Sequence, residues 1–161
     1  MIGPEIFGHF TPSMELFHKI LHNRLPFDPQ YELNFVHVKD VAMGMVLAEK
    51  KGRIGERYIL GNKYSESTTT VIQIAKNLYP SVRVPQKAGR KFQLMLAAFF
   101  YLTSKLTGNP PLLLKGNINH YYKKKENLNI KKAKTELSFV PRKPEEAIRE
   151  TLEYIAQLNL E

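Results

Sequence analysis

Two tyrosine–lysine pairs in this chain have a spacing that can carry acid–base chemistry. Tyr101 precedes Lys105 by four residues, and Tyr121 precedes Lys125 by the same interval. On a helix such a pair shares one face, where the ammonium group lowers the phenol pKa so that the phenol can exchange a proton with a substrate. The first pair, however, lies in a strongly apolar segment, and the second lies in a run of lysines where the spacing arises by chance. We therefore predict that neither pair is catalytic and that the chain carries no catalytic residue.

His18 and His22 are also four residues apart, a spacing with which helices bind zinc. A hydrolytic zinc helix needs a glutamate beside the first histidine as general base, and Lys19 occupies that position. The sequence offers no evident third ligand, and a chain without cysteine has neither a cysteine zinc site nor a disulfide. We predict surface histidines and no metal site.

The chain lacks the glycine-rich loops that hold nucleotide phosphates. A G-x-G-x-x-G turn between a strand and a helix lets the backbone approach a pyrophosphate. Neither this turn nor a G-x-x-x-x-G-K-[ST] loop occurs, and Gly52 and Gly55 are expected in a loop between a helix and a strand. We therefore expect no tight binding of a dinucleotide by this chain alone.

Length and composition favour a single folded unit spanning residues 1–161. A chain of 161 residues that is 43% hydrophobic and holds nine phenylalanines can bury a core and is not intrinsically disordered. The N-terminus has no secretory signal, and no run of about 18 apolar residues predicts a spanning helix. Together with the absence of cysteine, these features favour a cytoplasmic protein.

The net charge of +9 is unevenly distributed. Between Arg83 and Lys134 there are twelve basic residues and one acidic residue, Glu126. This segment could meet nucleic acid, an anionic membrane or a phosphate-bearing ligand, or it could be a solvated surface that keeps the protein soluble. Tyrosines and lysines interleave in residues 120–125 and could stack on single-stranded nucleic acid, but no recognisable nucleic-acid-binding motif accompanies them. Nucleic acid is therefore not an expected partner.

The segment from Phe92 to Leu106 is apolar on too many helix faces to form a single stripe. We expect it to be buried or to contact a second copy of the chain rather than to face solvent. Basic residues flank it at positions 90, 91 and 105, so a membrane surface is the alternative.

Helices and short strands are expected to alternate along the chain. We expect strands at Phe35–Val38 and Arg57–Leu60, the second apolar at three successive positions as in a parallel sheet covered on both faces. Asp40 is the expected N-cap of a helix that closes near Gly52. The other expected helices begin at Thr11–Pro12, at Ser67–Thr70, at Arg90, at Ile130 and at Pro144, the last burying Ala147, Ile148, Leu152, Ile155 and Leu158. This pattern predicts an α/β fold, but two short strands make an incomplete sheet.

Several phrases of the chain, taken in order, resemble the extended short-chain dehydrogenase/reductase superfamily. The resemblance is to the C-terminal half of the NAD-dependent epimerase/dehydratase family, in its dihydroflavonol-4-reductase-like branch. It departs from the family pattern at Asn129, where many members have aspartate, and at Ser138, where glycine is usual. The matching phrases are Met1–Pro4 ("IGP"), Asn34–Ala42 ("NFVxVxDVA", the most specific), Gly55–Gly61 ("GERYILG"), Lys131–Leu137 ("SKAKREL") and Pro144–Thr151.

The resemblance implies the C-terminal part of an NAD(P)-binding Rossmann-type fold, helix-rich with a few short strands. In the family the glycine-rich loop and the catalytic Tyr-x-x-x-Lys pair lie ahead of the "IGP" turn, so the N-terminal cofactor-binding half is expected to be absent here. The complete protein would use NAD or NADP on a hydroxyl- or carbonyl-bearing small molecule, sugar-nucleotide-like or dihydroflavonol-like. The resemblance places Ile2, Gly3 and Pro4 near the nicotinamide, and Phe10, Thr11, Ser13 and Met14 along the substrate pocket.

The residues leave two functions open. One is the substrate-binding part of a reductase or epimerase, inactive alone, with an N-terminal half or a second copy as partner. The other is a non-enzymatic module that docks its basic, apolar second half on a membrane or a partner protein. For Phe10, Thr11, Ser13 and Met14 the competing role is helix capping and core packing. His37 and Asp40 are expected to fix a strand-to-helix junction. The sequence does not decide the substrate, NAD versus NADP, or the oligomeric state.

Overall fold

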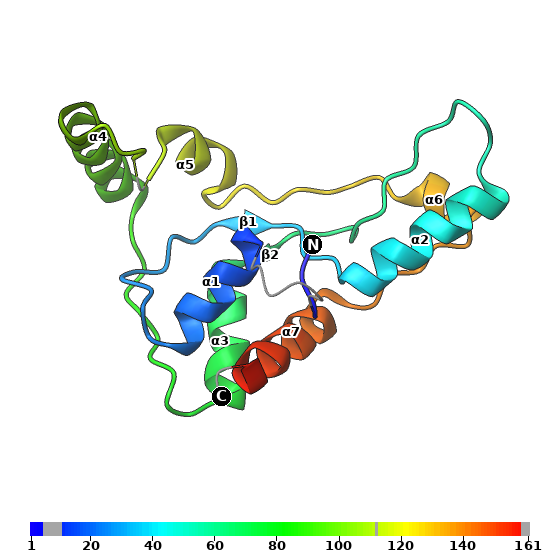
Figure 1. Cartoon of the computed structure of the whole chain (residues 1–161), viewed down its shortest axis with the longest axis horizontal. Helices are drawn as coiled ribbons and strands as arrows, with labels where there is room; N and C mark the ends of the chain where they lie inside the picture. The colour runs from blue at the N-terminus through cyan, green and yellow to red at the C-terminus, as the bar shows by residue number, and fades with distance from the viewer. Residues whose placement is uncertain (5–10, 112, 159–161) are drawn as a thin grey trace.

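The computed structural model describes residues 1–4, 11–111 and 113–158. Figure 1 shows an elongated molecule with α1, α3 and α7 in the middle, α4 and α5 at one end, and α2 and α6 at the other. Within the described residues the elements follow in the order α1 (Pro12–Leu21), β1 (Glu32–Leu33), α2 (Val38–Lys51), β2 (Glu66–Ser67), α3 (Thr68–Leu78), α4 (Arg90–Thr107), α5 (Lys115–Tyr121), α6 (Lys131–Glu136) and α7 (Pro144–Leu158).

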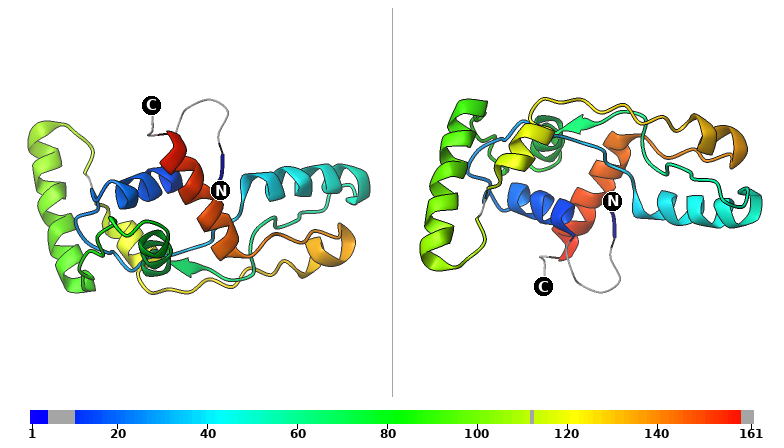
Figure 2. Two further views of the ribbon diagram at one scale, coloured as in Figure 1. Left: turned by 90° about the horizontal axis from the view of Figure 1, so that it is seen from below. Right: turned by 90° about the horizontal axis from the view of Figure 1, so that it is seen from above.

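Helices α1, α3 and α7 pack together and enclose the main core (Figure 2). Each helix contributes buried side chains to this core; Phe17 of α1, Ile72 of α3 and Ile148 of α7 are each at most 1% exposed. The stripe predicted for α7 is buried as expected, except that Leu158, the last helical residue, is 44% exposed. Burial of such side chains is the main source of stability for a domain of this size.

The predicted helix starts of α1 and α3 are confirmed by their caps. Thr11 Oγ1 accepts a hydrogen bond from the backbone N–H of Met14 at 3.3 Å, and Pro12 occupies the first helical position. Ser67 Oγ accepts from the backbone N–H of Thr70 at 3.0 Å. These bonds satisfy amide groups that would otherwise lack partners at a helix N-terminus.

Helix α2 begins earlier than predicted, and its N-cap is His37 rather than Asp40. The ring Nδ1 of His37 accepts from the backbone N–H of Lys39 at 3.2 Å, and the helix closes at Gly52 as expected. Asp40 lies in the first turn, where its charge suits the helix dipole. Helices α2 and α6 share a second, smaller core that contains Ala133, Leu137 and Phe139, with Leu47, Ala48, Tyr58 and Leu60 packed against it.

Strand pairing differs from the expectation at both predicted strands. The 35–38 segment pairs only through a parallel bridge between Ile2 and His37. Residues 57–60 form no strand, and Ile59 is 47% exposed. The prediction that this segment is a strand of a parallel sheet covered on both faces is therefore wrong. The strands of the described chain are β1 and β2, an antiparallel pair with Glu32 opposite Ser67 and Leu33 opposite Glu66.

Helix α4 forms as predicted, whereas α5 was missed. The α4 C-terminus is closed by Gly108, whose φ of 72° lies in the left-handed region. The prediction that this helix is buried within the chain is wrong, because only Gln93 and Ala97 are buried among its residues. Contact with another surface therefore stays a prediction. None of the helices in the described ranges has the length and hydrophobicity needed to span a bilayer.

Candidate functional site

The residues predicted to lie near a nicotinamide form a short parallel pair with the chain that leads into α2. The backbone N–H of Ile2 donates to Val36 O at 3.0 Å, and Ile2 O accepts from the N–H of Val38 at 2.8 Å. The Ile2 side chain is 2% exposed and belongs to the main core. The Ile2 backbone is thereby fixed beside the start of α2.

A glycine is required at position 3 both by the backbone conformation there and by the close approach of neighbouring side chains. Its φ is 126°, and a Cβ atom there would lie 2.8 Å from Nε2 of His37 and 3.0 Å from a methyl group of Val38. Any side chain would be strained and would displace the histidine. Packing against His37 therefore explains this glycine, and Pro4, partly buried, follows it.

The residues predicted to line a substrate pocket occupy the start of α1. Thr11 is the cap of this helix, and Ser13 is partly buried in its first turn. Met14 is 1% exposed and lies in the same core as Ile2, so the structure shows core packing for it. Phe10 lies outside the described residues. Contact of these four residues with a substrate stays a prediction.

Four ionisable side chains meet where α2 and α7 begin. Arg142 binds both oxygens of Asp40: its Nη2 lies 2.9 Å from Oδ1, and its Nε lies 3.1 Å from each oxygen. Its Nη1 donates to Glu150 Oε2 at 2.5 Å, and its backbone N–H donates to Asp40 Oδ2 at 2.9 Å. The same Glu150 oxygen lies 3.2 Å from Nε2 of His37, an atom that finds no hydrogen-bond partner among the described residues. We call these four residues the junction cluster.

The junction cluster shifts the protonation of its members. Burial lowers the pKa of His37, the nearby Arg142 lowers it further, and Glu150 and Asp40 oppose the shift. Hydrogen bonds to Asp40 raise the pKa of Arg142, which stays charged. His37 is thus held neutral, its Nδ1 lone pair capping α2. His37 and Asp40 thus fix the start of α2 as expected, although the residues ahead of it form a single bridge instead of the expected strand.

Stability is expected to fall as the pH drops below about 6.5, the ordinary histidine pKa. The unfolded chain binds a proton there that the folded chain resists, because the pKa of His37 is lowered on folding. One such proton gives a slope of at most about 1.4 kcal/mol per pH unit, and the loss ends once the pH passes below the folded pKa. Urea unfolding between pH 7.5 and 5 measures this slope.

The matched variant is His37→Asn, which keeps an acceptor that can cap α2 but cannot titrate. Its stability should depend less on pH in this window than that of the parent chain. His18→Gln measures the share of the slope that His18 contributes, because burial and the nearby His22 also lower the pKa of His18. An unchanged slope in the His37→Asn variant would show that the group responsible lies elsewhere.

A groove of about 730 Å³ opens beside the junction cluster, between residues 62–64, 127–134 and 139–144. Arg142 reaches its wall, but that charge is already neutralised by Asp40 and Glu150. Four lysines that form no ion pair with another described residue also line it, and so do apolar side chains. These groups are suited to an anionic ligand that has an apolar part. The four lysines are Lys63, Lys131, Lys134 and Lys143.

The motifs singled out from the sequence do not form a catalytic site in the described residues. Lys105 Nζ lies 5.0 Å from the centre of the Tyr101 ring on the exposed side of α4. The rings of His18 and His22 stack at 4.1 Å, and no group of three His, Cys, Asp or Glu residues that could hold a metal occurs in the described ranges. The groove lysines were missed because they come from three separate segments, and only the high basic content signalled them.

Comparisons with known proteins identify the fold. No family model matches the chain, and no curated protein matches its sequence. The solved structure of gox2253 is similar over 98% of this chain, with a TM-score of 0.73 and 24% identity. The UDP-glucose 4-epimerase of Thermotoga maritima with UDP-glucose (TM-score 0.64, 22% identity) and the yeast methylglyoxal/isovaleraldehyde reductase Gre2 complexed with NADPH (0.60, 21%) are each similar over 99% of it.

The chain therefore has the expected helix-rich α/β fold, that of a segment of Rossmann-type epimerase and reductase structures. It spans less than half the length of each structure, covering 47%, 44% and 45% of them respectively.

Proposed function

We propose that this chain is the substrate-binding, C-terminal part of an NAD(P)-dependent oxidoreductase or epimerase of the dihydroflavonol-4-reductase-like kind. Its substrate is a small molecule with a hydroxyl or carbonyl group. The observation that carries the proposal is the fold match over 98% of the chain to a structure more than twice as long. One similar structure is a UDP-glucose 4-epimerase and another is a reductase bound to NADPH, which supports a nicotinamide cofactor for the complete protein.

In this proposal the backbone of Ile2, Gly3 and Pro4 faces the nicotinamide end of the cofactor, and Phe10, Thr11, Ser13 and Met14 approach the substrate. The fixed pairing of Ile2 beside His37 supports the first assignment, because it gives this turn one defined position. The chain's own residues do not suffice to hold a dinucleotide, since Gly3 packs against His37 and the sequence has no phosphate loop. The cofactor is therefore NAD or NADP held mainly by another half of the protein.

The basic groove supports a sugar-nucleotide-like substrate over a dihydroflavonol-like one. Its four lysines without ion pairs would attract phosphate groups, while Leu128, Ile130 and Phe139 could contact a ring or sugar face. Titration with UDP-glucose, observed at the lysine and leucine NMR signals, tests this assignment. Lys131→Gln/Lys134→Gln should weaken binding, whereas Lys50→Gln/Lys51→Gln on the exposed end of α2 should not.

The isolated chain is expected not to bind NADH or NADPH tightly and not to transfer hydride. The physical reason is the missing phosphate loop and the missing catalytic tyrosine–lysine pair. Calorimetric or fluorescence titration measures the affinity. Saturable binding with a dissociation constant on the order of 10 μM or tighter, about −7 kcal/mol, would contradict the proposal. A complete reductase run in parallel is the positive control.

The alternative function is a non-enzymatic module that docks on a membrane or a protein partner. The observation that favours it is α4, whose apolar side chains face solvent at one end of the molecule. Docking by α4 does not exclude the enzymatic role, because the junction cluster and the groove lie away from this helix.

A further inference from the structure

Helix α4 presents an apolar stripe to solvent. Phe92, Met95, Phe99, Leu102 and Leu106 recur at intervals of three and four residues, so they lie along one side of the helix. Each is at least 47% exposed, and Leu106 is 87% exposed. A continuous exposed apolar stripe of this length marks an interaction surface.

The opposite side of α4 is fixed to the protein, so the stripe cannot turn inward. The Nε2 atom of buried Gln93 donates to Pro29 O at 3.0 Å and to Ala88 O at 2.9 Å. Ala97, one turn along, is 3% exposed. Arg90 Nη2 donates to Asn119 Oδ1 at 2.7 Å and so ties the helix to α5. The structure thus holds the apolar stripe outward.

The surroundings of α4 are strongly basic. Residues 67–125 contain ten lysines and arginines and no aspartate or glutamate. Arg90 and Lys91 begin the helix, Lys105 lies in its last turn, and Lys115 begins α5. An apolar stripe set among cations fits a surface that is apolar inside and anionic outside.

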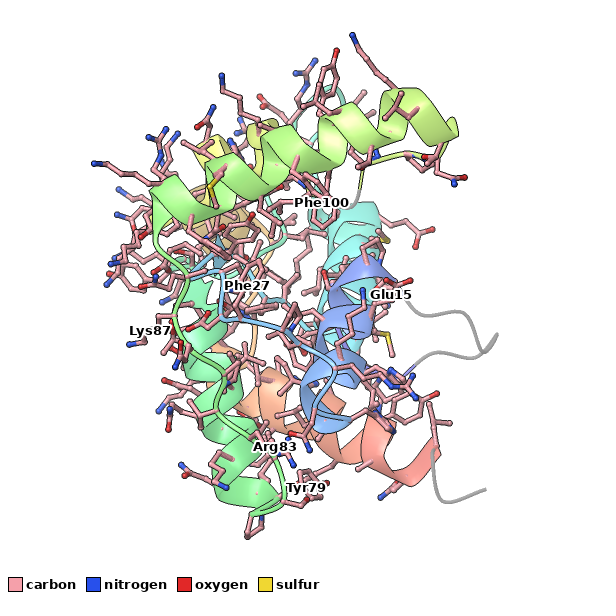
Figure 3. All side chains as sticks on the ribbon, turned by 90° about the vertical axis from the view of Figure 1, so that its left-hand side faces the viewer. Glu15, Phe27, Tyr79, Arg83, Lys87 and Phe100 are labelled. Carbon is pink, nitrogen blue, oxygen red and sulfur yellow. The ribbon has the colours of Figure 1, made fainter. Side chains whose placement is uncertain are left out.

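The position of α4 suits contact with a flat surface. The helix lies at one extreme of the longest axis in Figure 1, and Figure 3 shows it running across that end of the molecule, with nitrogen-tipped side chains gathered near its start. Between α4 and α5 lies an apolar groove of about 690 Å³, lined by Leu94, Ala97 and Leu114 among others, on the side of α4 that does not carry the stripe. A helix of 18 residues is about 27 Å long, so it can lie in a bilayer interface without spanning it.

We propose that α4 is a docking helix for an anionic lipid bilayer, with its stripe inserted below the headgroups and the neighbouring lysines and arginines on the lipid phosphates. A second copy of the chain fits less well, because both partners would bring a surface without acidic residues and a net charge of +9 each. The proposal specifies the surface on which the docking alternative named above would act, and it does not rest on the enzymatic function.

Flotation with vesicles tests the proposal directly. The chain should bind vesicles of phosphatidylcholine mixed with phosphatidylglycerol, bind phosphatidylcholine alone much less, and be released by high salt. The Phe99→Ser/Leu102→Ser variant should bind roughly tenfold more weakly for each side chain lost. The matched control is Met43→Ser/Met45→Ser, which removes two side chains of similar exposure from α2. Thermal unfolding should be unchanged in both variants, because all four side chains are exposed.

A tryptophan reporter gives a second measurement, because the chain has no tryptophan of its own. The fluorescence of Leu102→Trp should shift to the blue on addition of phosphatidylglycerol vesicles, and that of Met45→Trp should not. Absence of vesicle binding, or binding that the α4 variant leaves intact, would overturn the proposal. So would a concentration-dependent dimer in light scattering that the same variant abolishes, since a second copy would then cover the stripe.

Discussion

Replacement of Arg142 by methionine is expected to lower the free energy of unfolding by about 2 kcal/mol, between the values for exposed and for buried ion pairs. The guanidinium makes charge-assisted hydrogen bonds to Asp40 and Glu150, and its side chain is 22% exposed against 14% for Asp40. Methionine keeps the aliphatic stem but leaves two carboxylates close to buried His37 without a cation. Chemical denaturation at pH 7.5 measures the loss.

Arg53→Met is the matched control for this substitution. Arg53 also binds a carboxylate with two nitrogens, at 2.7 and 3.1 Å from Glu136, but its side chain is 63% exposed. Solvent screens such a pair, so the expected loss is much smaller than for Arg142→Met. The double variant Asp40→Asn/Arg142→Met should recover part of the stability lost in Arg142→Met. Equal losses of stability in Arg53→Met and Arg142→Met would show that the junction cluster contributes no more to stability than an exposed ion pair.

Helix positions could be predicted from the sequence because their signals are local. Thr11, Ser67 and Gly108 each cap a helix through bonds that span four residues or fewer. The buried stripe of α7 follows from the spacing of its apolar residues alone. Helix α5 was missed because its seven residues, KGNINHY, include two asparagines and a glycine and lack a repeating apolar stripe.

Strands and the junction cluster could not be predicted, because they depend on residues far apart in the chain. Tyr58, Ile59 and Leu60 have strand-like composition, but no neighbouring described strand pairs with them, so the composition alone forms no sheet. Arg142 and Asp40 are 102 residues apart, and nothing in either local sequence signals the pair. Asp40 was predicted as an N-cap on local grounds, but the buried ring of His37 takes that role three residues earlier.

Fusion with a cofactor-binding half is the second change with a large expected effect. In a parallel sheet one residue pairs with the strand on one side, and the next residue faces the strand on the other side. Ile2 pairs with the 36–38 segment, and no described residue pairs with the backbone of Gly3. This pairing is a single bridge rather than a sheet, and a stable sheet normally needs three or more strands. We predict that the chain alone is marginally stable, dimeric or partly molten.

The part of gox2253 that this chain does not cover is the half to supply, in trans or fused ahead of Met1. Binding at about a hundredfold above its dissociation constant adds roughly 2.7 kcal/mol. For a chain of 161 residues this corresponds to a rise in Tm of roughly 5–10 °C, measured by thermal unfolding at equal concentration. NADPH binding should appear in the same sample.

Two glycine variants test whether the rise in Tm caused by the added half depends on the contact between residues 2–3 and His37. Gly3→Ala forces a Cβ to within 2.8 Å of His37 Nε2 at a φ of 126°, and it should reduce or abolish the gain in Tm. Gly89→Ala adds a Cβ that meets no atom within 4 Å, and it should leave the gain intact. If the isolated chain already unfolds sharply as a monomer and gains nothing from the added half, it is a self-sufficient domain. The single Ile2–His37 bridge would then need no further strand beside it.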